Sequence, residues 1–488
     1  MKADDIVIST PAHPRRFRRA ATLLLAILCA GALASCAVFG KFNMVEIHQE
    51  SAARPQRNPV ILIHGFLGSK LRNTHTHEAV WGGFMNAMKR GRTDGLDLPI
   101  DSTDLSHNRD DIVPYALVES VVGVKFYGPI LKALRDVGGY RQGDINDPRP
   151  GDTLFIYNYD WRRDNVESAV GLGRAIEQIK DRLHAPEMRF DIVAHSMGGL
   201  VAQYYLGYGT EDVIGRGSPY AVTWAGAPNI GRMILIGTPL RGTMSAFRTL
   251  NTGISRTMSP AVVFTMPSLY QLLPSDGRVH VIDTHGDPLD IDLYNADDWV
   301  RNRWSVFNPR AEAARPLVPA AAARPDSPGK DSAEAPLRRF LQAVLGRARA
   351  FHDALAADAL AESPVPVHLF GSDCIPTLDR AVLKPTSSGP VILFDDESTP
   401  DRVARRLAKQ LLVPGDGTVT ARSLLAINVG EYGAADWSAG SRTFSSTFFF
   451  CETHGFLPRD QGFQGNLFYV LFHSPQRPAP LEGASGGK

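Results

Sequence analysis

The sequence lacks an excess of charge of either sign, and it shows no internal repeat. Its 52 basic residues nearly balance its 51 acidic residues, so the composition does not favour a nucleic-acid partner. Hydrophobic residues make up 44% of the 488 residues, which is enough to fill the core of an α/β domain with insertions. Because the composition indicates little more about the function, the function must be inferred from the residues of a candidate site.

The N-terminal apolar stretch lacks the length of a membrane-spanning helix, and the first 36 residues instead resemble an export signal. Arginines at positions 15–19 precede this stretch at residues 20–33, which is shorter than the roughly 20 residues of a spanning helix. The sequence Leu-Ala-Ser then leads into Cys36. This order is typical of a bacterial lipobox, in which the cysteine is lipidated and becomes the mature N-terminus. A plain signal peptide and an uncleaved anchor are the alternatives.

These features predict a lipoprotein of the cell envelope. Residues 1–35 are then the signal peptide, Cys36 is the lipidation site, and the polar residues 36–58 form a tether. Ala37, rather than Asp, follows the cysteine, which resembles outer-membrane sorting in Gram-negative bacteria. We therefore expect the chain to be anchored through its N-terminal lipid, at the bacterial outer membrane or the periplasmic face. The sequence does not indicate the oligomeric state.

The chain has only four cysteines. Cys29 lies in the apolar stretch and Cys36 in the lipobox, which leaves Cys374 and Cys451 in the exported part. An even pair outside the cytoplasm indicates a possible disulfide, which contributes roughly 4 kcal/mol in the chain-entropy model. Two separately buried thiols are an equally good interpretation.

Short apolar runs alternate with helical patterns along much of the chain. Asp164 and Glu167 have the spacing of a capping box, and the apolar stripe from Ala169 to Leu183 predicts a helix. Such alternation favours a doubly wound, mostly parallel sheet. Residues 390–394 either continue the sheet or form one arm of a hairpin. The strands are expected at residues 60–63, 152–157, 190–193, 232–236 and 365–371.

The alternation lapses after residue 240 and resumes near residue 361, which indicates an inserted cap. Within the cap, residues 311–336 are rich in Ala, Pro and Arg and are interpreted as disordered or as a surface loop. The expected order is a core at 59–240 with a substrate-side insertion at 70–127, a cap at 241–360, a second core part at 361–475 and a polar tail at 476–488.

Ser196 is the candidate nucleophile because it lies in a tight corner between a strand and a helix. The corner resembles a nucleophile elbow, usually G-x-S-x-G, with Ala194 in place of the first glycine and Gly198 as the second. The N–H of Met197, at the N-terminus of the helix, is predicted to hold an oxyanion. The alternative is that Ser196 merely caps the helix.

A second oxyanion donor is expected in the turn after residues 60–63. This turn lies at the carboxyl end of a buried strand, where open α/β sheets place their ligands. It contains His64, Gly65 and Phe66, and the N–H of Phe66 is the best candidate. We interpret His64 as a turn residue that bonds to the backbone rather than as a catalytic residue.

Asp416 and His454 are the candidate acid and base. Asp416 lies in a Gly-bracketed turn followed by Thr, where N–H groups and a hydroxyl can keep a carboxylate ionised. An ordinary Asp-Gly turn is the alternative. His454 precedes a glycine after a very apolar strand, and it is favoured over its nearest rival, His473. The order Ser, Asp, His is that of α/β-hydrolases.

These motifs together resemble the lecithin:cholesterol acyltransferase family of α/β-hydrolases. The most specific are the Tyr-Asp-Trp-Arg at residues 159–162 and the Gly-Asp-Gly-Thr-Val at residues 415–419. His64 departs from the animal members, which carry proline there, and Trp81 is the only candidate remnant of their membrane-binding insertion. The motifs follow the family's order, at residues 59–71, 159–162, 194–199, 236–239, 267–269 and 415–419 and at His454.

The resemblance implies an α/β-hydrolase fold with an inserted cap and a serine lipase or acyltransferase acting on lipid esters at a membrane surface. Ser196, Asp416 and His454 are then the catalytic residues, and no metal or organic cofactor is expected. We interpret Asp160 and Arg162 as a structural ion pair with Trp161 packed beside it. An esterase for soluble acyl compounds, a catalytically silent binding module and a purely structural envelope lipoprotein are the alternatives.

Overall fold

The computed structural model describes residues 43–53, 57–83, 95–121, 124–217, 220–254, 258–309, 331–355, 363–394, 401–427 and 444–473. The predicted signal peptide, the lipidation site Cys36 and the polar tail lie outside these residues. In this part of the chain, no helix combines the length and the hydropathy that crossing a membrane requires.

A six-stranded sheet forms the core of the described chain, and all its strand pairs are parallel. Three of its inner strands are fully buried and mainly apolar, as a sheet covered on both faces requires. The doubly wound, mostly parallel sheet predicted from the sequence is therefore confirmed. In spatial order the strands are β16 (Ser446–Phe449), β11 (Val367–Gly371), β9 (Ile230–Ile236), β8 (Phe190–His195), β1 (Val60–Ile63) and β7 (Leu154–Tyr157).

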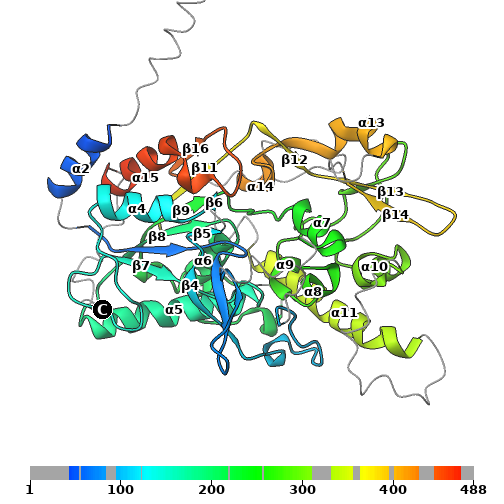
Figure 1. Ribbon diagram of the computed structural model, residues 1–488, viewed down its shortest axis with the longest axis horizontal. Coiled ribbons are helices and arrows are strands. Elements are labelled where there is room, and N and C mark those ends of the chain that lie inside the picture. The colour runs from blue at the N-terminus through cyan, green and yellow to red at the C-terminus, as the bar shows by residue number, and fades with distance from the viewer. Residues whose placement is uncertain are drawn as a thin grey trace, which may run out of the picture.

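Helices cover both faces of this sheet (Figure 1). On one face, α4 (Gly128–Lys132), its π-helical continuation η2 (Ala133–Val137) and α15 (Gln461–His473) pack against alternate strand residues. On the other face lie α5 (Asn165–Arg182) and α6 (Met197–Tyr208). Asp164 caps α5 by accepting from the Val166 N–H, as the capping pattern predicts.

The insertion at residues 70–127 contains a small antiparallel sheet. Strand β2 pairs with both of its neighbours and brings the chain back beside the first turn of the core. A short hairpin and a 3-10 helix complete the described part of this insertion. Its elements are β2 (Ser69–Asn73), β3 (Ala79–Trp81), η1 (Leu105–His107), β4 (Ile112–Leu117), β5 (Ser120–Val121) and β6 (Val124–Lys125).

The cap is mainly helical and lies beyond the carboxyl ends of the sheet strands (Figure 1). Helix α11 begins at Asp331, so the loop expected over residues 311–336 is wrong for its last six residues. The apolar stripe that follows Pro336 is buried and extends the helix across this segment; residues 311–330 lie outside the described chain. The cap elements are α7 (Met244–Thr252), α8 (Pro260–Phe264), α9 (Pro267–Tyr270), β10 (Val281–Ile282), α10 (Ala296–Arg301), η5 (Ser305–Phe307) and α11 (Asp331–Ala354).

The second part of the core contributes two strands to the main sheet and builds two smaller sheets beside it. Strand β14 (Val391–Leu393) pairs antiparallel with β13 (Ala381–Lys384), so residues 390–394 form the hairpin arm. Strand β12 (Ile375–Leu378) pairs antiparallel with β15 (Leu412–Gly415). The remaining elements of this part are α13 (Arg402–Leu411), α14 (Ala421–Leu424) and η7 (Leu457–Arg459). Two 3-10 helices, η3 (Ile214–Arg216) and η4 (Ala227–Asn229), belong to the first part of the core.

The polar segment at residues 36–58, expected as a tether, is partly helical. Helix α2 (Met44–Ala53) packs against η2 and α15. Ser51 donates a hydrogen bond to the Gly138 carbonyl, and Glu50 lies 3.0 Å from His473 Nε2. These contacts fix a short helix that has little apolar periodicity of its own. The tether prediction is therefore wrong for residues 44–53.

Candidate active site

Ser196 lies in the corner between β8 and α6. Its φ of 55° and ψ of −128° are unusual for a residue with a side chain, as expected for a nucleophile elbow. The serine side chain makes no capping hydrogen bond to the helix. The alternative of a simple helix cap is therefore wrong, because the hydroxyl points to another partner.

That partner is His454, which in turn contacts Asp416. Ser196 Oγ lies 2.8 Å from His454 Nε2, and His454 Nδ1 lies 2.7 Å from Asp416 Oδ2. A carboxylate can only accept, so Nδ1 carries the ring proton and Nε2 accepts from the serine hydroxyl. The structure thus brings together three side chains that are 220 and 38 residues apart. His473, the rival histidine, instead contacts Glu50 at the far end of α15.

The Asp416 carboxylate is fixed by its own turn. Its Oδ1 accepts from the N–H of Thr418 at 2.9 Å and from the N–H of Val419 at 2.7 Å, which fix the orientation of the carboxylate. Asp416 is only 2% exposed. It follows β15, which belongs to the two-stranded sheet and not to the main sheet that positions Ser196.

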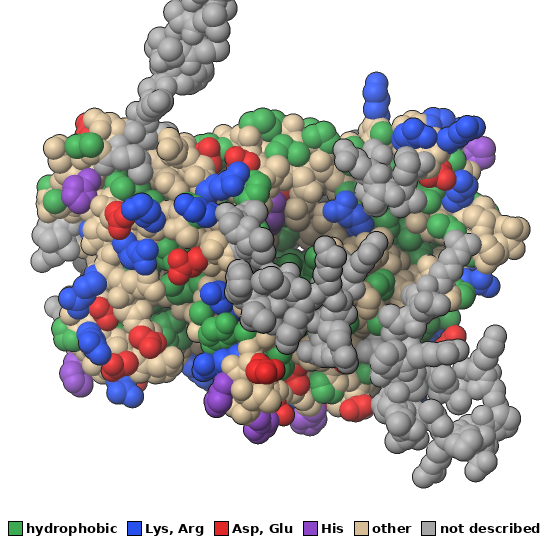
Figure 2. Space-filling model, in the orientation of Figure 1, with side chains coloured by type: hydrophobic (Ala, Val, Ile, Leu, Met, Phe, Trp, Pro, Cys, Tyr) green, Lys and Arg blue, Asp and Glu red, His purple; other side chains and the backbone are tan. Residues whose placement is uncertain are grey.

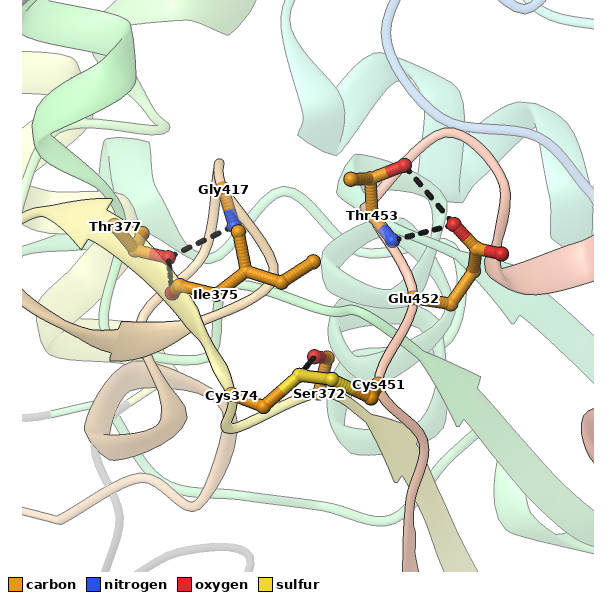
Figure 3. The surroundings of a disulfide bond; sticks show 8 residues. All are labelled: Ser372, Cys374, Ile375, Thr377, Gly417, Cys451, Glu452 and Thr453. Atoms are coloured by element: carbon orange, nitrogen blue, oxygen red, sulfur yellow. Dashed lines mark hydrogen bonds between the residues drawn. A yellow bond between two sulfur atoms is a disulfide. The ribbon is translucent and has the colours of Figure 1, made fainter. Parts of the chain in front are cut away.

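A disulfide joins the segment that lies beside the Asp416 turn to the loop that carries His454. Cys374 and Cys451 are bonded, with Cα atoms 5.6 Å apart. Figure 3 shows the bridge running from the segment beside the Asp416 turn to the loop that leads into the histidine. The N–H of Gly417 donates to Thr377 Oγ1 at 2.8 Å, and the N–H of His454 donates to the Asp416 carbonyl at 2.9 Å. Of the two interpretations left open, the structure has the disulfide.

The two predicted oxyanion donors flank Ser196. Met197 is the first residue of α6, and Phe66 lines the same cavity as the serine. Gly65 brings this turn close, since a Cβ there would lie 2.7 Å from the Ser196 Cβ. Within the described residues, neither predicted N–H donates to a protein acceptor. Both groups are therefore free to bind an incoming oxygen.

His64 is a turn residue, as we interpreted it. Its Nδ1 lies 2.9 Å from the Gly65 carbonyl, and its ring stacks on Tyr159 with centroids 4.4 Å apart. Burial lowers the pKa of His64 to about 4, so the ring is neutral at neutral pH. The histidine supports the turn without facing Ser196.

A cavity of about 370 Å³ opens above Ser196, and most of its lining is apolar. Figure 2 shows the surface hollowed between the sheet and the cap, with hydrophobic side chains at the bottom. Thr418 lines the cavity too, and its carbonyl accepts hydrogen bonds from Thr243 and Ser245 of the cap. The apolar side chains come from the insertion, the core and the cap, and include Phe66, Leu67, Trp81, Val118, Phe126, Pro239, Ala246, Leu269, Leu272 and Val419.

Two residues that line the site, Tyr127 and His195, had no assigned role in the sequence analysis. Tyr127 and His195 line the cavity and bond to each other at 2.7 Å. A histidine directly before the nucleophile was a visible signal, but Tyr127 had none. The predicted ion pair of Arg162 with Asp160 is present and fully buried at the arginine, and Asp110 is a second partner at 2.7 Å.

No group of three or more His, Cys, Asp or Glu side chains suited to a metal ion occurs among the described residues. The prediction that the protein needs neither metal nor organic cofactor stays a prediction.

Comparison with known sequences supports the resemblance drawn from the motifs. The family model for lecithin:cholesterol acyltransferase matches residues 139–277, a segment that includes Ser196. The uncharacterized protein YJR098C of Saccharomyces cerevisiae is 28% identical over 250 residues, which cover 51% of this chain and 34% of the yeast protein. The match thus spans about a third of the length of that relative. The family resemblance is confirmed.

Comparison with solved structures supports the fold. The crystal structure of the Tle4–Tli4 complex is similar with a TM-score of 0.50 and 14% identity, covering 85% of this chain and 98% of that chain. Lipase 1 from Pelosinus fermentans is similar with a TM-score of 0.34 and 14% identity, covering 86% and 99%. The α/β-hydrolase fold predicted from the sequence is confirmed. The fold and the resemblance to that family together support an esterase- or lipase-type hydrolase or an acyltransferase.

Proposed function

Given its similarity to the lecithin:cholesterol acyltransferase family, we propose that this chain is a serine lipase, phospholipase or acyltransferase that acts on lipid esters. The observation that carries the proposal is the line of hydrogen bonds from Asp416 through His454 to Ser196. It ends at the floor of a mainly apolar cavity, which suits an acyl chain.

In this mechanism Ser196 Oγ attacks the acyl carbonyl while His454 Nε2 takes its proton. Asp416 holds the ring tautomer and stabilises the imidazolium. The N–H groups of Met197 and Phe66 bind the oxyanion, and losing one such donor costs about 10²- to 10³-fold in rate in comparable enzymes. His454 then returns the proton to the leaving alcohol, which departs and leaves an acyl ester on Ser196. Water or a second alcohol takes up the acyl group.

The decisive experiment compares the purified protein with its Ser196→Ala variant on mixed phospholipid, neutral lipid and sterol, followed by mass analysis of the products. We expect free fatty acid or a new ester from the wild type, and neither from the variant at an unchanged melting temperature. Equal products from both proteins would rule out Ser196 as the nucleophile.

The other interpretations predict different outcomes. A preference for short acyl chains in a chain-length series favours an esterase for soluble compounds. Absence of labelling by a fluorophosphonate probe, which reacts with activated serines, favours a silent binding module. An envelope phenotype that Ser196→Ala leaves unchanged favours a purely structural lipoprotein.

The membrane location is part of the same proposal. An N-terminal lipid on Cys36 would hold the catalytic domain against a lipid surface, which suits a substrate of low solubility. The test is incorporation of labelled palmitate into the wild type and the Cys36→Ser variant, with fractionation of the bacterial envelope. Label in both proteins, or in neither, contradicts anchoring at this cysteine.

A further inference from the structure

A chain of hydrogen bonds behind Ser196 connects two loops of the site. The N–H of Gly65 lies 2.9 Å from Tyr127 Oη, which lies 2.7 Å from His195 Nδ1. His195 Nε2 in turn lies 3.1 Å from the carbonyl oxygen of His454. Gly65 precedes Phe66 in the oxyanion turn, and His454 is the proposed base. The chain therefore runs from one to the other through the residue that directly precedes the nucleophile.

The direction of each bond follows from the groups at the two ends. A backbone N–H only donates and a carbonyl oxygen only accepts. His195 therefore carries its proton on Nε2, and its Nδ1 accepts from the Tyr127 hydroxyl, whose oxygen accepts from Gly65. Burial, reinforced by the neighbouring His454, lowers the pKa of His195 to about 3. The ring is neutral at neutral pH, and all donors and acceptors of the chain are matched.

We propose that Tyr127 and His195 are positioning residues, which hold the oxyanion turn and the base loop at fixed distances from Ser196. This inference rests on the proposed function. Both nitrogens of His195 are engaged by protein groups, so it does not exchange protons with the substrate. Bonds that point the same way along a chain strengthen one another, so removing either side chain releases both loops. Misplacement by 1 Å costs about 100-fold in rate.

Tyr127→Phe tests the proposal, since it removes one hydroxyl and keeps the ring. We expect kcat on an ester substrate to fall about 10- to 100-fold, with KM nearly unchanged. Tyr157→Phe is the matched control, because Tyr157 is a buried tyrosine whose hydroxyl donates to the Ser168 carbonyl at 2.8 Å, away from the cavity. It should lose similar stability but keep its kcat. Equal effects on kcat in the two variants, or none in Tyr127→Phe, would overturn the proposal.

Variants of His195 provide a second test. His195→Gln keeps a donor near the His454 carbonyl and should retain more activity than His195→Phe. The double variant Tyr127→Phe/His195→Phe should be no slower than the slower single variant, because both changes break one chain. Multiplying effects on kcat, or a glutamine variant as slow as the phenylalanine variant, contradict the proposal.

The Ser196→Ala variant separates this inference from the function on which it rests. If Ser196→Ala keeps turnover, the proposed function fails and the positioning role fails with it. If Ser196→Ala abolishes turnover while Tyr127→Phe is as fast as the wild type, only the positioning role fails.

Discussion

The proposed nucleophile and its two partners are held by different kinds of structure. Ser196 follows a fully buried strand of the parallel sheet, and the oxyanion turn follows the strand beside it. Asp416 follows a strand of a separate two-stranded sheet, and His454 lies in a loop after the edge strand β16. The nucleophile half, which consists of Ser196 and the oxyanion turn, is positioned by core packing. The acid and base half, which consists of Asp416 and His454, is positioned by a few local contacts.

The two halves therefore differ in how many contacts must fail before the geometry is lost. Around Ser196, close backbone approach leaves no room even for a methyl group at Gly65. Around the acid and base, a disulfide and single hydrogen bonds hold the segments in place. Each such hydrogen bond contributes only about 1 kcal/mol. Changes to the two halves should accordingly differ in kind, which four experiments examine.

Asp416→Asn should have the largest effect. An amide at this position favours the wrong tautomer of His454, so kcat should fall about 10⁴-fold. The measurement is steady-state ester hydrolysis together with the rate of fluorophosphonate labelling at Ser196, and both should fall. Asp373→Asn, an exposed change close to the disulfide, is the control and should keep full activity. A kcat within tenfold of the wild type would exclude Asp416 as the acid.

Gly65→Ala should break the nucleophile half. The new Cβ would lie 2.7 Å from the Ser196 Cβ and 3.2 Å from its Oγ, so the oxyanion turn has to move away. We expect kcat to fall about 100-fold, as for the loss of one oxyanion donor. Gly215→Ala is the control, because a Cβ there meets nothing within 4 Å. Equal kcat in both variants would show that the turn does not serve Ser196.

Reducing the disulfide should have a smaller effect, confined to the acid and base half. Both cysteines are exposed, so a dithiol can reduce the bond to two thiols and is itself oxidised to a disulfide. We expect a loss of about 2–4 kcal/mol in the free energy of unfolding and a several-fold fall in kcat. The Cys374→Ala/Cys451→Ala variant should show the same fall and no response to the dithiol. Unchanged kcat in the reduced wild type contradicts this role.

Stability should depend on pH with opposite signs at the buried histidines beside Ser196 and at His280 of the cap. Burial lowers the folded-state pKa values of His64 and His195 to about 4 and about 3. Folding there favours the neutral ring, so stability is lost as pH falls below the ordinary 6.5. Despite burial, Asp276 and the Asp379 carbonyl raise the pKa of His280 to about 9, so its contribution is lost as pH rises from about 6.5 to about 9.

Urea unfolding between pH 4 and pH 9 measures both slopes. His280→Gln should flatten the alkaline slope and leave the acid slope in place. If this variant keeps the full alkaline slope, the ion pair of His280 with Asp276 is not the source of that slope.

The sequence predicted the nucleophile half closely because its signals are local. An apolar run, a tight corner and a helical stripe specify β8, Ser196 and α6 without reference to the rest of the chain. The capping pattern at Asp164 placed α5 for the same reason. Buried parallel strands and their turns can be recognised from consecutive residues, as an apolar run followed by small turn residues.

The acid and base half was less predictable because its contacts join segments that are distant in the sequence. The turn at Asp416 was recognisable, but its placement on a separate sheet depends on the pairing of β12 with β15. The sequence leaves the disulfide as one of two options, because it does not specify the distance between Cys374 and Cys451. The role of Tyr127 was not predicted, because a buried tyrosine that follows a segment of mixed composition belongs to no recognisable sequence pattern. Helix α2 was missed because packing, not periodicity, fixes it.

Thr418 gives the cavity a way to influence the reaction itself. Its N–H holds the Asp416 carboxylate, its carbonyl is held by Thr243 and Ser245, and it forms part of the wall. In the proposed mechanism, an acyl chain that presses on this wall therefore also acts on the turn that orients the acid. Discrimination between chains of different shape should then show up in how fast a bound ester reacts, and not only in how tightly it binds.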